Sequence, residues 1–119
     1  MPGALVWRMA FTRVAFPAMP WQPGGHPLEK KKTHTSRPVT LLEFAPGFSD
    51  PNWCERAHVF LVLAGAFELE LVDGLGRLAT GECGLVDRGT RHRARNPGGE
   101  PCVLFALSDV EIGTATSNP

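Results

Sequence analysis

The sequence predicts an all-β protein whose antiparallel strands form a sandwich or a barrel. Its 13 glycines and 11 prolines interrupt the chain at intervals of roughly eight to twelve residues from about residue 36 onward, which is typical of short strands. Residues 67–72 alternate apolar with mainly acidic side chains, as in a half-buried antiparallel strand. The connections are too short for the crossovers that parallel strands need.

Length and charge restrict the class of protein. The 119 residues suit one domain, and an apolar fraction of 43% argues against disorder throughout. Twelve basic residues balance twelve acidic ones, so the net charge gives no general attraction to nucleic acid or to an anionic membrane. The charged runs at 29–32 and 88–95 are interpreted as solvated faces. We therefore expect neither a nucleic-acid partner nor a membrane partner.

The cysteines and the N-terminal residues bear on the compartment. Cys54, Cys83 and Cys102 match no zinc-ribbon or CxxC spacing, and their odd number argues against a disulfide framework. Residues 1–20 lack the apolar core of a signal peptide, and no stretch approaches the ~20 apolar residues of a membrane span. We expect a cytoplasmic protein, with Cys83 and Cys102 in the core.

The elements are taken in chain order. Residues 4–16 are compatible with one apolar strand that joins a sheet edge or a partner subunit, so a homodimer is predicted. Residues 17–27 are too rich in proline for a central strand. The predicted organisation is an N-terminal strand and extended segment at 1–26, a barrel at 27–112 and a frayed tail at 113–119. Strands are expected at 39–44, 59–63, 67–72, 77–79, 84–86, 91–95 and 102–107.

Two segments carry the residues that indicate chemistry. In an extended segment 91–96, Arg91, Arg93 and Arg95 share one face and His92 lies on the other. Arginines rarely point into a dry core, so His92 is expected to point inward. Both faces of the segment around His58 are apolar, so alternation does not decide which way this ring points.

Imidazole and thiolate together suit zinc, iron, nickel or copper, which makes a divalent transition metal the expected cofactor. The metal-ligating candidates are His58, His92 and Cys54, and neither His26 nor His34 is expected to supply a fourth ligand. The alternative is that the histidines are core residues bonded to backbone or water. Cys54 is alternatively a small buried hydrophobe.

The spacing of these segments resembles that of the cupins, a family of β-barrels with two short motifs on neighbouring strands. The second motif is matched by Gly81, Gly89, His92 and Asn96 with every spacing kept, and Asp87 stands where the family has proline. The resemblance covers roughly residues 20–108. It implies an antiparallel double-stranded β-helix, the jelly-roll barrel, with His92 as a metal ligand.

The first motif departs from the family's pattern. His58 and Gly65 keep the spacing of its last two positions, with histidine in place of glutamate. The two preceding histidines of the motif are missing, and Asn52, Trp53 and Cys54 occupy that region. The combination of Trp-Cys with a histidine four residues after the cysteine is similar to that of a subset of small single-domain cupins.

Three functions remain open at this point. The first is a cupin that binds a divalent transition metal and a small molecule inside the barrel, with any activity assisted by the metal. The second is a metal-free ligand-binding or sensing module, and the third is a structural or interaction domain. The residues predicted to contact a ligand are Trp53, Phe60 and Asn96, and no catalytic residue is assigned.

Overall fold

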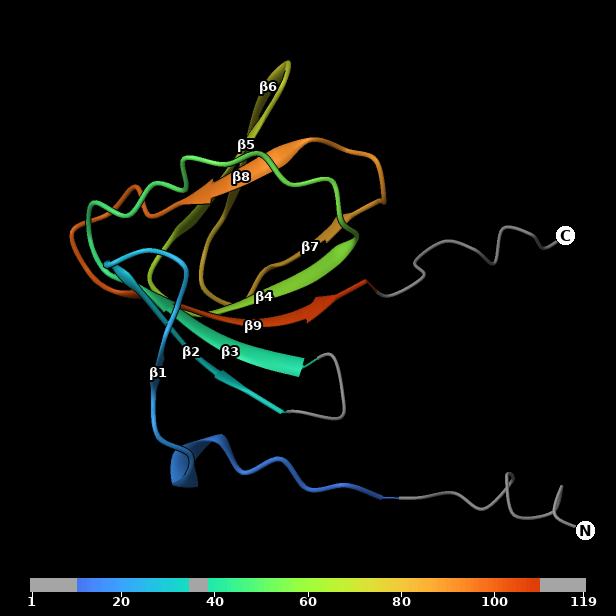
Figure 1. The fold of residues 1–119 in the computed structure, drawn as a ribbon. Helices are drawn as coiled ribbons and strands as arrows, with labels where there is room; N and C mark the ends of the chain where they lie inside the picture. The colour runs from blue at the N-terminus through green and yellow to red at the C-terminus, as the bar shows by residue number, and fades with distance from the viewer. Residues whose placement is uncertain (1–10, 35–38, 110–119) are drawn as a thin grey trace, which may run out of the picture.

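The computed structural model describes residues 11–34 and 39–109 of the chain. These residues form two antiparallel sheets, one with six strands in the order β1-β2-β3-β9-β4-β7 and one with three in the order β6-β5-β8 (Figure 1). The elements are a 3-10 turn, η1 (Phe16–Ala18), and the strands β1 (Gln22–Pro23), β2 (Glu29–Thr33), β3 (Val39–Phe44), β4 (His58–Ala64), β5 (Phe67–Leu71), β6 (Gly74–Leu78), β7 (Cys83–Val86), β8 (His92–Arg95) and β9 (Cys102–Ser108).

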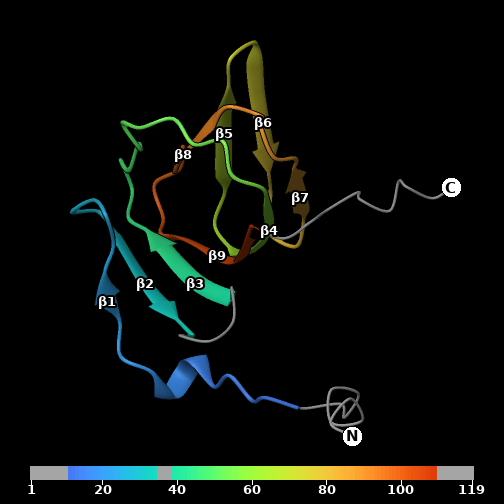
Figure 2. The same ribbon diagram turned by 45° about the vertical axis from the view of Figure 1, so that its right-hand side comes forward.

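The hydrophobic core lies between the two sheets, and Figure 2 shows β5, β6 and β8 across the barrel from β1, β2 and β3. Strands β3, β9 and β4 lie side by side and contribute Phe44, Leu104 and Val62, whose exposed fractions are 4%, 0% and 0%. From the smaller sheet, Phe67 packs against Phe60 with ring centroids 5.1 Å apart. Each such side chain contributes about 1.5–3 kcal/mol by leaving water.

The outer face of the three-stranded sheet is held by ion pairs. Glu68 on β5 is fully buried beneath Arg95 and Arg77, both of which hydrogen-bond to its carboxylate. The hydrogen bond from Arg95 is the largest cause that lowers the pKa of Glu68, and it outweighs the opposing effect of burial. Arg93 pairs with Glu70 in the same way, at 2.8 Å. These pairs keep Arg93 and Arg95 on the outside and therefore turn His92 inward.

The structure corrects the interpretation of residues 29–32 as a merely solvated charged run. These residues belong to β2, which pairs with β1 and β3. The amino groups of Lys30 and Lys32 lie 4.8 Å and 4.6 Å from the centroid of the Trp21 ring, and Lys32 donates to the carbonyl of Phe16. The lysine stems cover an aromatic ring while their charges reach polar partners, so the strand needs no alternation of apolar residues.

Two smaller expectations also fail. Residues 11–15 have no regular secondary structure and η1 follows them, so the described part of the segment 4–16 is not a strand; the remainder lies outside the described residues.

Cys83 is exposed, because it pairs with Leu61 on the outward side of β4, whereas Cys102 is buried as expected. All three cysteines are free thiols. Among the described residues, no helix has the length and apolar character needed to cross a membrane.

Candidate metal centre

Two strands and one loop bring three potential ligands to the same end of the barrel. His58 is the first residue of β4 and pairs with Val86 and Ser108 of the flanking strands. His92 is the first residue of β8, in the opposite sheet. Cys54 forms an isolated bridge with His92, with N–O distances of 2.8 Å and 2.9 Å in the two directions. The backbone of Cys54 is therefore fixed directly beside one of the two histidines.

The potential ligand atoms of Cys54, His58 and His92 all lie within 4.8 Å of one another. The Cys54 sulfur is 3.5 Å from Nε2 of His58, and the two imidazole centroids are 4.9 Å apart with the rings nearly perpendicular. Register settles the orientation that alternation had left open for His58. Its ring shares the inward face of β4 with Phe60 and Val62, which are 6% and 0% exposed.

His92 has one satisfied and one unsatisfied ring nitrogen. Its Nδ1 donates to the carbonyl oxygen of Thr90 at 2.7 Å, so the lone pair is on Nε2. The residue is 3% exposed, and its Nε2 is buried without a hydrogen-bond partner. A buried polar atom left in this way costs about 1–3 kcal/mol. A metal ion, or a donor group of a ligand, would remove that cost.

His58 is held neutral by its surroundings. Burial is the largest cause that lowers its pKa from 6.5 to about 4, and the charges of His92 and Arg56 act in the same direction. Its Nδ1 lies 3.1 Å from the hydroxyl oxygen of Ser108. When Nδ1 donates to Ser108, the lone pair of Nε2 faces Cys54, which is the form a metal ion requires.

The sulfur of Cys54 receives support from the backbone. The N–H of Arg56 donates to it at 3.4 Å. The guanidinium of Arg56 is turned away to Asp109, with an N–O distance of 2.7 Å. Residues 54–58 therefore carry two potential ligand atoms and one backbone donor to the first of them.

One distance within the group agrees with a tetrahedral metal site. With bonds of about 2.3 Å to sulfur and about 2.0 Å to nitrogen, neighbouring sulfur and nitrogen ligands lie roughly 3.6 Å apart. The observed 3.5 Å between the Cys54 sulfur and Nε2 of His58 matches this value. The upper limit of 4.8 Å on the distances among all three ligand atoms is wider. Three protein ligands leave a fourth position for water or a bound molecule. His26 does not belong to the group; its Nδ1 accepts from the N–H of Leu28 at 3.0 Å.

A polar groove opens beside His58 on the inner face of the six-stranded sheet, with a volume of about 480 Å³. It contains Lys31, which has no ion pair or hydrogen bond within 11–34 and 39–109, and the paired Arg56 and Asp109. Neither Lys31 nor Ser108 was predictable from the sequence, because β2 was not expected and Ser108 lies 50 residues from its partner His58. The other residues of the groove are Glu29, Thr33, Thr40, Leu42, Phe60 and Ala106.

Of the three residues predicted to contact a ligand, only Phe60 lies at this site. Its ring stacks on His58, with centroids 4.9 Å apart and planes at 26°. Trp53 instead packs under the outward guanidinium of Arg93, 4.3 Å from the ring centroid. The amide of Asn96 is used entirely by the backbone.

That amide donates to the carbonyls of Phe44 and Glu100 and accepts from the N–H of Gly98. Asn96 is 5% exposed, so its three bonds fix the turn that follows β8 from within the protein. The side chains of Trp53 and Asn96 thus contact groups other than the three potential ligands.

Solved structures show the same fold. KdgF from Halomonas sp. aligns with a TM-score of 0.69 at 22% identity, over 86% of this chain and 96% of that one. The polyketide cyclase RemF from Streptomyces resistomycificus gives 0.68 at 22% identity, over 85% and 81%. CENP-C of Drosophila melanogaster bound to CAL1 gives 0.67 at 17% identity, over 79% and 82%. No curated protein matches the chain by sequence.

The sequence profile of the cupin domain matches residues 40–108, which is more than half of the chain. This range contains both segments that carry the candidate ligands, together with strands β3 to β9. The two-sheet antiparallel barrel agrees with that assignment. The chain is a member of the cupin family.

Proposed function

We propose that this cupin binds one divalent transition metal ion through Cys54, His58 and His92, and a small molecule next to that ion. The observation that carries the proposal is the buried, unpartnered Nε2 of His92, a residue whose potential ligand atom lies within 4.8 Å of those of Cys54 and His58. Zinc, iron, nickel and copper all accept a donor set of one sulfur and two imidazole nitrogens.

The chain's own residues would prepare the site. Thr90 and Ser108 hold the two imidazole rings through Nδ1, which leaves each Nε2 available. The ion would supply Lewis acidity toward an oxygen atom of a bound molecule. We assign no general acid or base, so the proposal is for metal-assisted ligand binding, with any reaction following from the chemistry of the ligand.

The second candidate is a metal-free binding or sensing module. It is favoured by the contact between Cys54 and His58, which satisfies both groups without an ion, and by the absence of the first motif's usual histidines. The fold alone does not decide between them, because it is shared by a polyketide cyclase and by CENP-C bound to CAL1.

Metal content separates the two candidates. The protein is purified without chelator, and bound metals are measured in the wild type, in His92→Ala and in His26→Ala. The proposal predicts near-stoichiometric metal in the wild type and in His26→Ala, and loss of the metal in His92→Ala. Wild-type protein that stays metal-free after incubation with zinc, iron, nickel and copper salts would favour the sensing module instead.

We further propose that the protein forms a homodimer. The outward face of the six-stranded sheet carries Leu63 and Leu85, which are 48% and 64% exposed, and the apolar N-terminal residues precede η1. Burial of these side chains against a second copy would remove them from water. Deletion of residues 1–16 should convert a dimer to a monomer in light scattering, and an unchanged molar mass would count against a role for this segment.

A further inference from the structure

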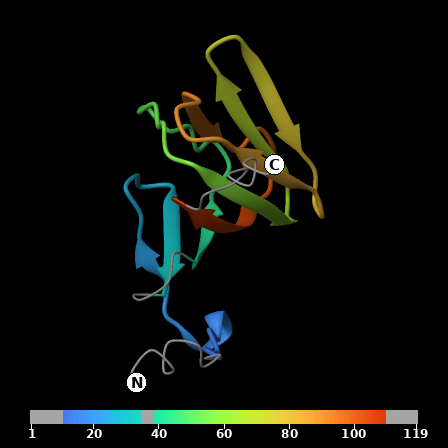
Figure 3. The ribbon, with the colours of Figure 1, turned by 90° about the vertical axis from the view of Figure 1, so that its right-hand side faces the viewer.

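The two sheets of the barrel are joined differently along their two open edges. The free edge of β8 is closed by the loop before β4, through isolated bridges from Ser49 to Arg95 and from Cys54 to His92. Strands β6 and β7 are the end strands of different sheets and are not paired with each other. Figure 3 shows the β5–β6 hairpin projecting beyond the rest of the barrel. An unpaired seam therefore runs between β6 and β7.

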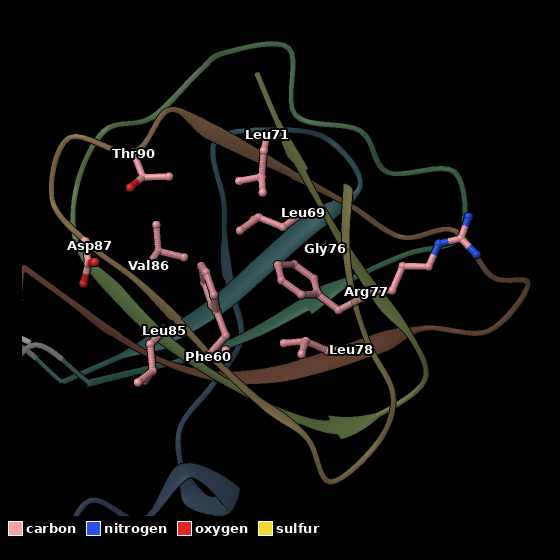
Figure 4. A pocket seen from close by; sticks show the side chains of 12 residues that line it. Phe60, Leu69, Leu71, Gly76, Arg77, Leu78, Leu85, Val86, Asp87 and Thr90 are labelled. Atoms are coloured by element: carbon pink, nitrogen blue, oxygen red, sulfur yellow. The ribbon is translucent and has the colours of Figure 1, made fainter. Parts of the chain in front are cut away.

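A pocket of about 280 Å³ lies along this seam, distinct from the polar groove (Figure 4). Phe60, Leu69 and Val86 project into it in Figure 4, while the side chain of Arg77 leads away from it. Glycines on both sides of the seam, Gly76 and Gly84, leave the backbone without side chains there. The remaining lining is Phe67, Leu71, Leu78, Leu85, Asp87 and Thr90.

Apart from Arg77, the polar side chains that line the pocket are those of Asp87 and Thr90, which lie at one end of it. In Figure 4, Asp87 and Thr90 lie on the side opposite Arg77, whose guanidinium is bound to Glu68. Within the described residues, the side chains of Asp87 and Thr90 have no hydrogen-bond partner. The pocket therefore offers an apolar body with a donor and an acceptor at one end, which suits an aromatic ring system that carries a hydroxyl group.

The pocket shares its wall with the candidate metal centre. Phe60 lines the pocket and stacks on His58. Thr90 also lines the pocket, and its carbonyl oxygen fixes the ring of His92. A molecule seated in the pocket would touch the residues that back both imidazoles.

We infer that the small molecule bound by this cupin is a hydroxylated aromatic compound whose ring occupies the pocket between β6 and β7. The inference rests on the proposed function for the neighbouring ion and adds the chemical class of the ligand. A polar ligand would have to use the groove beside His58, where Arg56 is already occupied by Asp109 and Lys31 is exposed. The apolar pocket offers the larger gain from removal of ligand surface from water.

The probes are 2-naphthol and, as a polar compound of similar size, glucose. Binding is measured by calorimetry on chelator-treated protein and on cobalt-loaded protein. Leu69→Trp fills the pocket, and Val72→Trp places the same residue at an exposed position outside the pocket as a matched control. We expect 2-naphthol to bind the wild type and Val72→Trp alike, and to bind Leu69→Trp at least about tenfold more weakly. Glucose should not bind.

A second variant keeps the test decisive if Leu69→Trp fails to fold. Asp87→Asn changes an exposed side chain, and it should weaken 2-naphthol several-fold while leaving naphthalene unaffected. Equal binding of 2-naphthol to all variants, or binding of glucose without 2-naphthol, would overturn the inference. Binding of 2-naphthol to a protein that takes up no metal would refute the metal site alone, whereas a metal-loaded protein that ignores 2-naphthol would refute the ligand class alone.

Discussion

The carbonyl oxygen of Thr90 accepts a hydrogen bond from Nδ1 of His92 at 2.7 Å, and this contact determines which nitrogen of the ring can bind a metal. The other nitrogen, Nε2, is buried beside Cys54 and His58 without a hydrogen-bond partner. Orientation of a ligating histidine through its second nitrogen is a regular feature of metal sites. Here the orienting group is backbone, so it does not depend on the identity of residue 90.

Metal should stabilise the folded protein through these ligands. An ion that binds only the native state adds about 2.7 kcal/mol at a free concentration one hundred times its Kd. We expect zinc to raise the Tm of the wild type by roughly 10 °C or more, since about 1 kcal/mol corresponds to several degrees in a domain of this size. Differential scanning calorimetry of His92→Ala and His26→Ala with and without zinc checks this. A similar rise in His92→Ala would show that zinc binds elsewhere.

Stability should fall in acid because of Glu68. Its pKa is lowered from the usual 4.5 by Arg95 and Arg77, so the carboxylate stabilises the fold above about pH 4.5, and this contribution is lost as the pH falls through the lower native value. Urea unfolding of the wild type and Glu68→Gln between pH 7 and pH 3 tests the sign. The variant should be less stable at pH 7 and should lose less stability on acidification. Parallel curves would contradict the role given to Glu68.

Gly65 and Gly81 separate two effects of a glycine. Both adopt positive φ, at 77° and 90°. A Cβ added at Gly65 would lie 2.5 Å from the carbonyl oxygen of Pro101, whereas a Cβ added at Gly81 would have no atom within 4 Å. Alanine at Gly81 should cost about 1–2 kcal/mol for the left-handed conformation alone. Alanine at Gly65 should cost more, because β4 and the start of β9 must also move apart. Chemical denaturation measures both, and equal losses would show that the contact with Pro101 relaxes freely.

Asn96 is expected to act on stability and leave metal binding intact. Asn96→Ala removes three hydrogen bonds from buried or partly buried backbone groups of Phe44, Gly98 and Glu100. Of the three, the bond to the Phe44 carbonyl is buried, and loss of its partner costs about 1–3 kcal/mol, so a drop of at least this size in unfolding free energy should follow. The exposed Asn52 offers the control Asn52→Ala. If Asn96→Ala keeps its stability but loses a ligand or the metal, Asn96 belongs to the binding site after all.

The inward direction of His92 was predictable because three arginines fix the opposite face of β8. The structure adds the reason, which is that Glu68 and Glu70 of β5 hold Arg93 and Arg95 outside. The direction of His58 was not predictable, since both faces of β4 are apolar and only pairing with β7 and β9 decides which one is the core.

Long-range contacts limited the rest of the prediction. Strand β2 was missed because lysines stacked on Trp21 replace the usual apolar alternation. Trp53 packs against Arg91 and Arg93, and the sequence did not predict these contacts. Ser108 reaches His58 from a strand 50 residues further along the chain. The predictions of a cytoplasmic location and of a homodimer stay predictions.

Cobalt spectroscopy tests most directly whether Cys54, His58 and His92 bind the same ion. One equivalent of Co²⁺ added to chelator-treated protein should give the visible bands of a four-coordinate site and the near-ultraviolet charge-transfer band of a thiolate ligand. In Cys54→Ser the charge-transfer band should vanish, while in Cys83→Ser, which changes an exposed thiol on β7, it should persist. A wild-type spectrum with six-coordinate, thiolate-free cobalt would contradict the proposed centre.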